Sequence, residues 1–287
     1  MPRYDEHMAV LITKADGERE PYNPHKLLQS LKRSGADQSV AESIEKDIEK
    51  ELYSGITTQE MYRRAFAHLR ESRKDTAARY SLKRALLEFG PSGFPFEEYL
   101  ARLFQAEGYS TKTDQIIKGT CVEHEIDVLM TKGDVTTYVE AKFHNTPGFK
   151  TDLKTTLYVK ARLDDIAAER KAKGVPGGMN GLIVTNTKFT SQAAQYASCA
   201  GVEILSWEEP IGNTLQDRIE RAQLYPVTAL TTLAHREKMA LLGQKVVLCQ
   251  SLPHEMEALR GAGVTGHKAT RVLEEVGALC VPTKGLE

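Results

Sequence analysis

The stretch HEIDVLMTKGDVTTYVEAKFH, residues 124–144, decides the fold of the middle of this chain. Two runs rich in β-branched and aromatic residues flank Gly133-Asp134, a pair typical of a two-residue hairpin loop. Counting outward from that loop sets Asp127 directly opposite Glu140. Because side chains alternate along a strand, Lys142 then shares their face. A three-residue loop would send these side chains to opposite faces, so the prediction depends on the register.

Two carboxylates and an ammonium on one face make a poor core, but they suit a divalent cation beside a reacting phosphate. Apolar residues alternate with them at Val139, Ala141 and Phe143, which indicates a central strand. Unpaired carboxylates on a central strand would cost too much free energy without a function. The alternative is a surface cluster of weak salt bridges.

Composition sets broad limits on the class of protein. The 287 residues are enough for two or three domains, and 41% hydrophobic with 27% charged residues is ordinary for a soluble globular protein. A net charge of -1 means that any nucleic-acid contact must come from a local patch. Residues 1–7 lack the apolar core of a secretion signal, and no run reaches membrane-spanning length. Four scattered cysteines, without a Cys-x-x-Cys pair, indicate reduced thiols, so we expect a cytoplasmic protein that does not enter the membrane.

The pattern predicts three domains, at 1–90, 94–212 and 220–287. In the first, a β-rich run at 10–14 meets a turn at 15–18, and helices follow at Asn23-Pro24, 39–52, 57 onward and 75–87. The second reads as helix 96–104, the hairpin, helix 152–173, strand 181–186, helix 190–200 and strand 202–207. This is an α/β order with a mixed sheet flanked by helices. The third is helical at 232–242 and 253–277, around a β-rich run at 245–249, and we find no long internal repeat.

The first domain carries a spaced motif, KADG..EPYN..KL..SL, over residues 14–31. It resembles the ATP-cone, the regulatory nucleotide-binding module of ribonucleotide reductases, and the resemblance extends to residues 55–58 and 78–84. That family is small, mostly helical and begins with a β-hairpin, which clasps ATP or dATP together with the first helix. The resemblance implies phosphate and ribose contacts by Lys14, Asn23 and Lys26, with Glu20, Thr58 and Lys83 as second-rank candidates. Ala15 stands where the family often has another basic residue, and a degenerate cone that only mediates oligomer contacts is the alternative.

Elementary chemistry agrees with this reading. Lysines supply point charges for phosphates, and the helix start after Asn23 offers free backbone N–H groups to an anion.

The second domain resembles the PD-(D/E)XK nucleases, most closely the Mrr-like restriction endonucleases. The resemblance rests on Phe96-Glu97, on residues 125–128 with 139–142, and on GLIVTN at 181–186 followed by residues 189–193. It implies that Asp127, Glu140 and the backbone carbonyl of Ala141 bind Mg²⁺. It also implies that Lys142 acts on the attacking water, with Glu97 as an auxiliary catalytic carboxylate. DNA-contact candidates are His144, Lys154, Lys160 and Arg162, whose alternative is a solvated helix face.

In the third domain, residues 259–264 and the following segment 269–273 resemble a helix-hairpin-helix. The alternative is that this domain serves only for packing or dimerisation. The sequence thus predicts a multidomain α/β protein that acts as a Mg²⁺-dependent DNA endonuclease of the restriction type. ATP or dATP would regulate it without hydrolysis, because no Walker motif is present. Cutting both strands favours a homo-oligomer. The rivals are a nucleotide-responsive DNA-binding protein with a non-catalytic nuclease fold, and a structure-specific repair nuclease.

Overall fold

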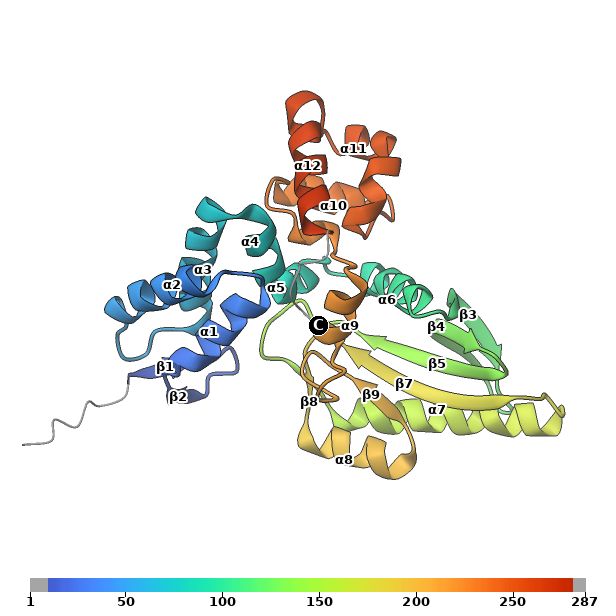
Figure 1. Cartoon of the computed structure of the whole chain (residues 1–287). Helices are drawn as coiled ribbons and strands as arrows, with labels where there is room; N and C mark the ends of the chain where they lie inside the picture. The colour runs from blue at the N-terminus through green and yellow to red at the C-terminus, as the bar shows by residue number, and fades with distance from the viewer. Residues whose placement is uncertain (1–9, 281–287) are drawn as a thin grey trace, which may run out of the picture. The chain divides into compact units, whose positions relative to one another are not determined.

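The computed structural model describes residues 10–280, and Figure 1 labels its helices and strands. The sequence argument about residues 1–7 therefore lies outside the described residues. Backbone contacts divide the described chain into two compact units, one ending at Ser81 and one beginning at Leu82. No helix among residues 10–280 has the length and apolarity needed to cross a bilayer.

The first unit begins with a hairpin of β1 (Leu11–Thr13) and β2 (Arg19–Pro21). Four helices follow: α1 (Pro24–Arg33), α2 (Gln38–Lys50), α3 (Thr58–Ser72) and α4 (Lys74–Tyr80). The predicted cap is confirmed, because the Asn23 side chain accepts a hydrogen bond from the His25 N–H at 3.0 Å. Leu31, Ile48 and Leu69 are fully buried in the core that joins these helices.

One predicted helix is wrong. The segment 75–87 forms two helices, α4 and α5 (Leu82–Leu87), interrupted at Ser81. The Ser81 hydroxyl donates to the Ala78 carbonyl at 2.9 Å, and such local bonding competes with a continuous helix.

The second unit is built on a five-stranded sheet in the order β3-β4-β5-β7-β9. The strands β3 (Ser110–Lys118), β4 (Glu123–Lys132) and β5 (Val135–Lys142) are antiparallel, whereas β7 (Gly178–Thr185) and β9 (Glu203–Leu205) run parallel to β5. The mixed sheet is therefore confirmed. Lys132 pairs with Val135, as a two-residue loop requires, and Gly133 takes the positive φ of 59° that such loops need.

Strand β3 was missing from the sequence prediction. Its sequence, STKTDQIIK, has no apolar alternation, because it is an edge strand whose every second side chain is exposed. Polar edge strands lack the apolar alternation by which half-buried strands are recognised.

Three helices cover the sheet: α6 (Phe94–Ala106), α7 (Leu153–Ala172) and α8 (Ser191–Ala200) (Figure 1). Helix α6 packs on β3 and β4, while α7 and α8 pack beside each other. Capping residues set two of these helix starts, because the Asp152 and Thr190 side chains accept N–H bonds from Thr155 and Ala193. A second small sheet pairs β6 (Lys150–Thr151) with β8 (Lys188–Phe189).

The chain then forms α9 (Leu215–Ala222), η1 (Val227–Ala229), α10 (His235–Gly243), η2 (Cys249–His254), α11 (Met256–Gly261) and α12 (Gly266–Leu279). The predicted β-rich run at 245–249 is not a strand; it makes one isolated bridge, Pro226 with Leu248. Three helix ends in this region share one cap, in which a residue with positive φ (Gln223, Lys245, Gly263) precedes an N–H that bonds a carbonyl five residues back, as is common at helix C-termini.

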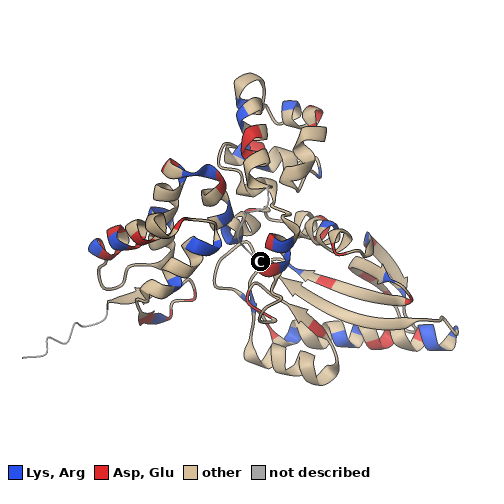
Figure 2. Ribbon diagram, in the orientation of Figure 1, with Lys and Arg blue, Asp and Glu red and all other residues tan. Residues whose placement is uncertain are grey.

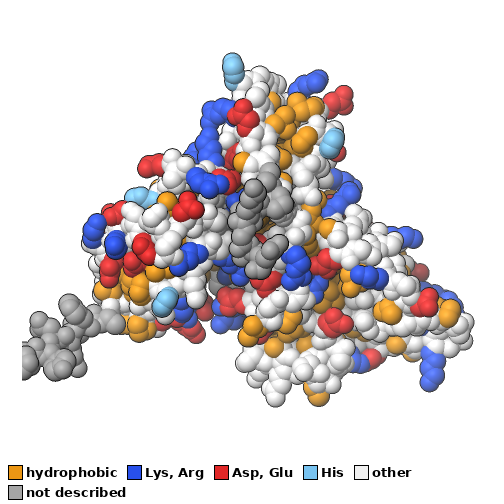
Figure 3. Space-filling model, in the orientation of Figure 1, with side chains coloured by type: hydrophobic (Ala, Val, Ile, Leu, Met, Phe, Trp, Pro, Cys, Tyr) orange, Lys and Arg blue, Asp and Glu red, His pale blue; other side chains and the backbone are white. Residues whose placement is uncertain are grey.

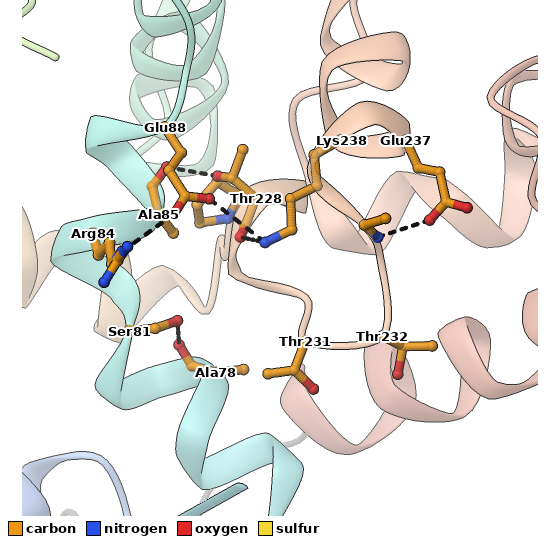
Figure 4. A network of polar contacts seen from close by, with 12 residues as sticks. Ala78, Ser81, Arg84, Ala85, Glu88, Thr228, Thr231, Thr232, Glu237 and Lys238 are labelled. Carbon is orange, nitrogen blue, oxygen red and sulfur yellow. Dashed lines mark hydrogen bonds and ion pairs between the residues drawn. The ribbon is translucent and has the colours of Figure 1, made fainter. Parts of the chain in front are cut away.

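Polar contacts within the second unit fasten α5 to this helical region (Figure 4). The buried Thr228 hydroxyl donates to the Ala85 carbonyl at 2.7 Å, and Lys238 donates to the Thr228 carbonyl at 2.6 Å. The Lys238 ammonium also lies 3.6 Å from Glu88. The helix that follows Ser81 is therefore structurally part of the second unit.

Candidate active site

The ends of β4 and β5 bring Asp127, Glu140 and Lys142 together. The backbone ladder stops at Val128 and Val139, one step short of Asp127 and Glu140. Beyond that point the Asp127 side chain replaces the backbone as hydrogen-bond acceptor, and its Oδ2 accepts the Ala141 N–H at 2.7 Å. A side chain thus replaces a backbone partner at this point and fixes the direction of one carboxylate.

Glu140 is held from the other side by Arg162 of α7. The Arg162 Nη1 atom donates to Glu140 Oε2 at 2.5 Å, and Nη2 donates to the Tyr158 hydroxyl at 2.6 Å. The guanidinium also lies over the Tyr158 ring, 4.6 Å from its centroid. Both partners of the ion pair are 9% exposed, so the pair is shielded from water.

Arg162 is therefore a correction to the expected DNA contacts. A buried guanidinium bound to Glu140 is not available to a phosphate on the surface. Lys154 is exposed on the same helix, and Lys160 pairs with Asp164 one turn further on. Figure 2 shows both signs of charge along α7, and Figure 3 shows them interspersed over the visible face of the molecule.

Glu97, on the first turn of α6, is half-buried and belongs to the same electrostatic environment. Burial raises the pKa of Glu97 to about 7, and repulsion from Asp127, Asp114, Glu125 and Glu140 adds to the shift. Asp114 has a positive φ of 52° and lies level with Asp127 in the β3–β4 register. Sequence reasoning missed Asp114 because it missed the strand that carries it.

Asp127 shows the same effect. Burial raises the pKa of Asp127 to about 6, repulsion from Glu140 adds to it, and the Ala141 N–H opposes it. Carboxylates that repel one another in a partly buried place are a donor set that a divalent cation would stabilise. Within residues 10–280, no three His, Cys, Asp or Glu side chains converge closely enough to hold an ion by themselves. Asp127 and Glu140, with the carbonyl of Ala141 directly after Glu140 in the chain, are the donors expected from the sequence for a metal.

Lys142 ends β5, opposite Thr185 of β7, and is half-buried. Within the described residues its ammonium makes no hydrogen bond or ion pair, which leaves it available to a ligand.

His144 follows Lys142 by two residues and is fixed by Asn186. The Asn186 Oδ1 accepts the His144 N–H at 2.9 Å, and its Nδ2 donates to the His144 carbonyl at 2.7 Å. The His144 ring lies 3.2 Å from the Thr151 hydroxyl, and burial lowers its pKa, with Lys142 adding to the effect. Asn186 is the residue whose role sequence reasoning missed, although it stands within the quoted motif GLIVTN.

His124 lies away from this arrangement. Its Nε2 atom is 2.8 Å from Asp165 Oδ2, and Asp165 also accepts the N–H groups of Cys121 and Val122. The hydrogen bond to His124 is the main cause that lowers the pKa of Asp165 to about 2. The group ties the β3–β4 loop to α7, so its role is structural.

The nucleotide candidates of the first unit also cluster. Lys14 Nζ lies 3.0 Å from Glu20, and Lys26 Nζ lies 3.1 Å from the other oxygen of Glu20. Asn23 opens the helix that carries Lys26. A bridge between Thr13 and Thr57 brings together the segments that carry Lys14 and Thr58.

These charges are solvated, and the hydrogen bond from Lys14, followed by that from Lys26, lowers the pKa of Glu20. Lys83 is different, because it belongs to the second unit. There its ammonium lies 5.7 Å from the Trp207 ring centroid and 3.9 Å from Glu208.

Three family models match the chain in succession. They are the ATP cone domain over residues 10–87, a restriction endonuclease model over 91–209, and the AF1548-like C-terminal model over 225–280.

Individual proteins match as well. An uncharacterised protein of Archaeoglobus fulgidus is 34% identical over 178 residues, which is 61% of this chain and 97% of the relative. The crystal structure of AF1548, a protein of unknown function, is similar with a TM-score of 0.54 and 32% identity, over 66% of this chain and 98% of that one. The MspJI restriction endonuclease in complex with a 27-mer oligonucleotide has a TM-score of 0.36 and 19% identity, over 69% of this chain and 39% of that one, too weak a likeness to support a conclusion.

Proposed function

Because the chain belongs to the AF1548-like family and carries an ATP-cone before a restriction-endonuclease domain, we propose that it is a metal-dependent DNA endonuclease of the restriction type that responds to ATP or dATP. The observation that carries the proposal is the meeting of Asp127, Glu140 and Lys142 at the ends of β4 and β5. A pair of carboxylates that can bind a metal, beside an ammonium with no protein partner among residues 10–280, suits phosphodiester hydrolysis, whereas a structural core avoids such a group.

Asp127, Glu140 and the carbonyl of Ala141 would hold Mg²⁺. Bound there, the ion would neutralise charge on the scissile phosphate and make a bound water more acidic. The Ala141 N–H orients Asp127, and Arg162 fixes Glu140 through Oε2, leaving its second oxygen for the metal.

Lys142 supplies a positive charge that has no hydrogen-bond or ion-pair partner among the described residues. Placed beside the carboxylates, it orients the attacking water and stabilises the negative charge that builds on phosphorus. Glu97, part-protonated near neutral pH, is the auxiliary carboxyl at the edge of the same site. Exposed Lys154 is available for phosphate contact.

The nucleotide site is proposed at Lys14, Asn23, Lys26 and Thr58 in the first unit. Glu20 pairs with both lysines, and a triphosphate would replace it as their counter-ion. Regulation requires that nucleotide favour one state of the nuclease over another, which is a coupling free energy between two sites. Cleavage of both strands needs two active sites, so the acting species is proposed to be a homo-oligomer.

A plasmid-cleavage assay tests this function. Supercoiled plasmid is incubated with protein and Mg²⁺, Ca²⁺ or EDTA, each with ATP, dATP or no nucleotide. We expect nicking or linearisation only with Mg²⁺, at a rate that nucleotide changes. Failure to cut plasmid, flaps, junctions or RNA–DNA hybrids under every condition would overturn catalysis.

One observation favours a second function. Arg162 occupies an oxygen of Glu140, as a cation would, which fits a nuclease fold that binds DNA in response to nucleotide without cutting it. Under that alternative, nucleotide changes DNA affinity, no substrate is cleaved, and Asp127→Ala leaves binding unchanged. A repair nuclease would instead cut flaps or junctions in preference to plasmid.

A further inference from the structure

Directly after Lys142, the chain forms a small aromatic pocket. Its lining consists of Pro91, Phe143, His144, Asn145, Thr146 and Phe149. We infer that this pocket holds a single unstacked nucleobase of the DNA, next to the phosphate that is cut. The inference rests on the proposed nuclease function and specifies its substrate as DNA with a locally unpaired or extruded base.

Two residues of the pocket lining, Phe143 and His144, are held by neighbouring side chains. Phe143 packs against Phe96, with ring centroids 5.8 Å apart, and against Phe89 at 6.4 Å. The next residue, His144, is held through its backbone by the fully buried Asn186. A preformed surface loses little conformational entropy when a ligand binds.

A second aromatic residue of the pocket lining, Phe149, exposes its ring to solvent. Phe149 is 59% exposed and stacks on His144, with centroids 5.9 Å apart and planes at 18°. Tyr53 and Tyr158 are about as exposed, but each has a hydroxyl that bonds a neighbour. Phe149 has no polar tip, so only a ligand that covers its ring would remove that apolar area from water.

Two polar residues of the pocket lining, Asn145 and Thr146, can form hydrogen bonds with the edge of a base. Asn145 and Thr146 are exposed, and they are joined by a hydrogen bond of 3.1 Å between their side chains. An amide and a hydroxyl beside a flat aromatic wall match a nucleobase, which has a π face and hydrogen-bonding edges.

Position selects DNA as the source of the base. His144 lies two residues after Lys142, so the Cα atoms are at most about 7 Å apart. The pocket therefore lies close to the proposed cleavage site. Bases inside a duplex are stacked and cannot enter, whereas an unpaired or extruded base can.

Binding in Ca²⁺, which supports DNA binding without cleavage, tests the inference. The probes are a fluorescein-labelled single-stranded 20-mer, the same strand in a perfect duplex, and a duplex with one unpaired 2-aminopurine. We expect Phe149→Ala to weaken binding of the single strand and of the unpaired-base duplex roughly fivefold to a hundredfold, the effect of losing one base–aromatic stack. Perfect-duplex affinity should stay within about twofold of wild type, because phosphate contacts dominate it.

Two further variants keep the test specific. Phe149→Leu retains apolar area without a π face and should lose most of the same affinity. Ile211→Ala removes a side chain that is 96% exposed outside the pocket and should bind all three probes like wild type. If wild type binds the probes but Phe149→Ala matches it, the pocket inference is wrong and the nuclease proposal stands. If wild type binds no DNA, both are wrong.

Discussion

The site at the ends of β4 and β5 and the lysine cluster of the first unit use the same residue types in opposite ways. Around Asp127, carboxylates are partly buried and repel one another, which raises their pKa values. Around Glu20, the carboxylate lies between two solvated lysines, which lowers its pKa. The first arrangement costs stability because like charges repel, whereas the second gains from pairs of opposite charge.

This difference teaches which ligand each region can recognise tightly. A strained set of carboxylates gains much from a divalent ion, because binding removes an existing repulsion. An exposed lysine pair gains less from a phosphate, since water and Glu20 already compensate its charge. Substitutions of charged residues should therefore change activity and stability more in the nuclease domain than they change nucleotide affinity in the first unit.

The largest effect is expected on catalysis. Asp127→Asn and Lys142→Ala should each lower the plasmid-cleavage rate by roughly a hundredfold to a thousandfold, because each removes electrostatic stabilisation of the transition state. Initial rates at saturating Mg²⁺ measure this. Lys171→Ala, which removes an exposed lysine in the last turn of α7, is the control and should stay within about threefold of wild type. A comparable loss in the control would mean that general positive charge, not the site, governs the rate.

The next effect is on folding. Arg162→Met should lower the free energy of unfolding by about 3 kcal/mol, because it leaves the buried Glu140 without a counter-charge. Urea denaturation measures it.

Arg102→Ala is the control, since Arg102 makes an exposed pair with Glu98 and its loss should cost about 0.5 kcal/mol or less. Adding Glu140→Gln to Arg162→Met should restore part of the loss. If Arg162→Met and Arg102→Ala lowered the free energy of unfolding equally, the Arg162–Glu140 pair would not behave as a buried ion pair.

Substitution of Asp127 should increase the free energy of unfolding, by less than the Arg162 substitution lowers it. In EDTA, Asp127→Asn should raise stability by about 1–2 kcal/mol at pH 8, because it removes a carboxylate that is costly to ionise. The pKa of Asp127 is about 6 in the folded protein, above its ordinary value of about 3.9. Wild-type stability should therefore fall as pH rises from about 4 through 6, and the advantage of the variant should disappear at pH 4. Thermal denaturation across this range measures it, and a pH-independent advantage would refute the cause.

The smallest effect concerns nucleotide affinity. Lys14→Ala and Lys26→Ala should each weaken ATP binding about twofold to fivefold, the size of an exposed charge interaction, without changing stability by more than about 0.5 kcal/mol. Calorimetric titration measures the affinity. Lys50→Ala, at an exposed lysine paired with Asp47, should leave it unchanged. An effect beyond a hundredfold would show that the first unit closes over its ligand and shields it from water.

Local patterns predicted much of the fold correctly. The Gly133-Asp134 loop set the β4–β5 register, and Asn23 and Pro24 marked the start of α1. The ATP-cone and restriction-endonuclease resemblances are confirmed by family matches over residues 10–87 and 91–209. These features depend on neighbours a few residues apart, so the sequence states them directly.

Errors arose where local and long-range forces differ. The β-rich run 245–249 packs into a helical region instead of pairing as a strand. Strand β3 exists because β4 offers it a partner, not because of its own weakly apolar sequence. Arg162 looked like one more solvated helix charge until the fold buried it against Glu140.

The sequence by itself therefore determined most of the elements, the hairpin register and most of the candidate side chains. Only the tertiary structure decided that Arg162 holds Glu140 from 22 positions away and that Asn186 clamps His144 from 42 positions away. The physical reason is range. Turn, capping and alternation preferences act between near neighbours, whereas burial, pKa shifts and ion pairing arise only when distant segments exclude water from one another. The charges at Asp127 and Glu140 were visible in the sequence, but their repulsion exists only in the fold.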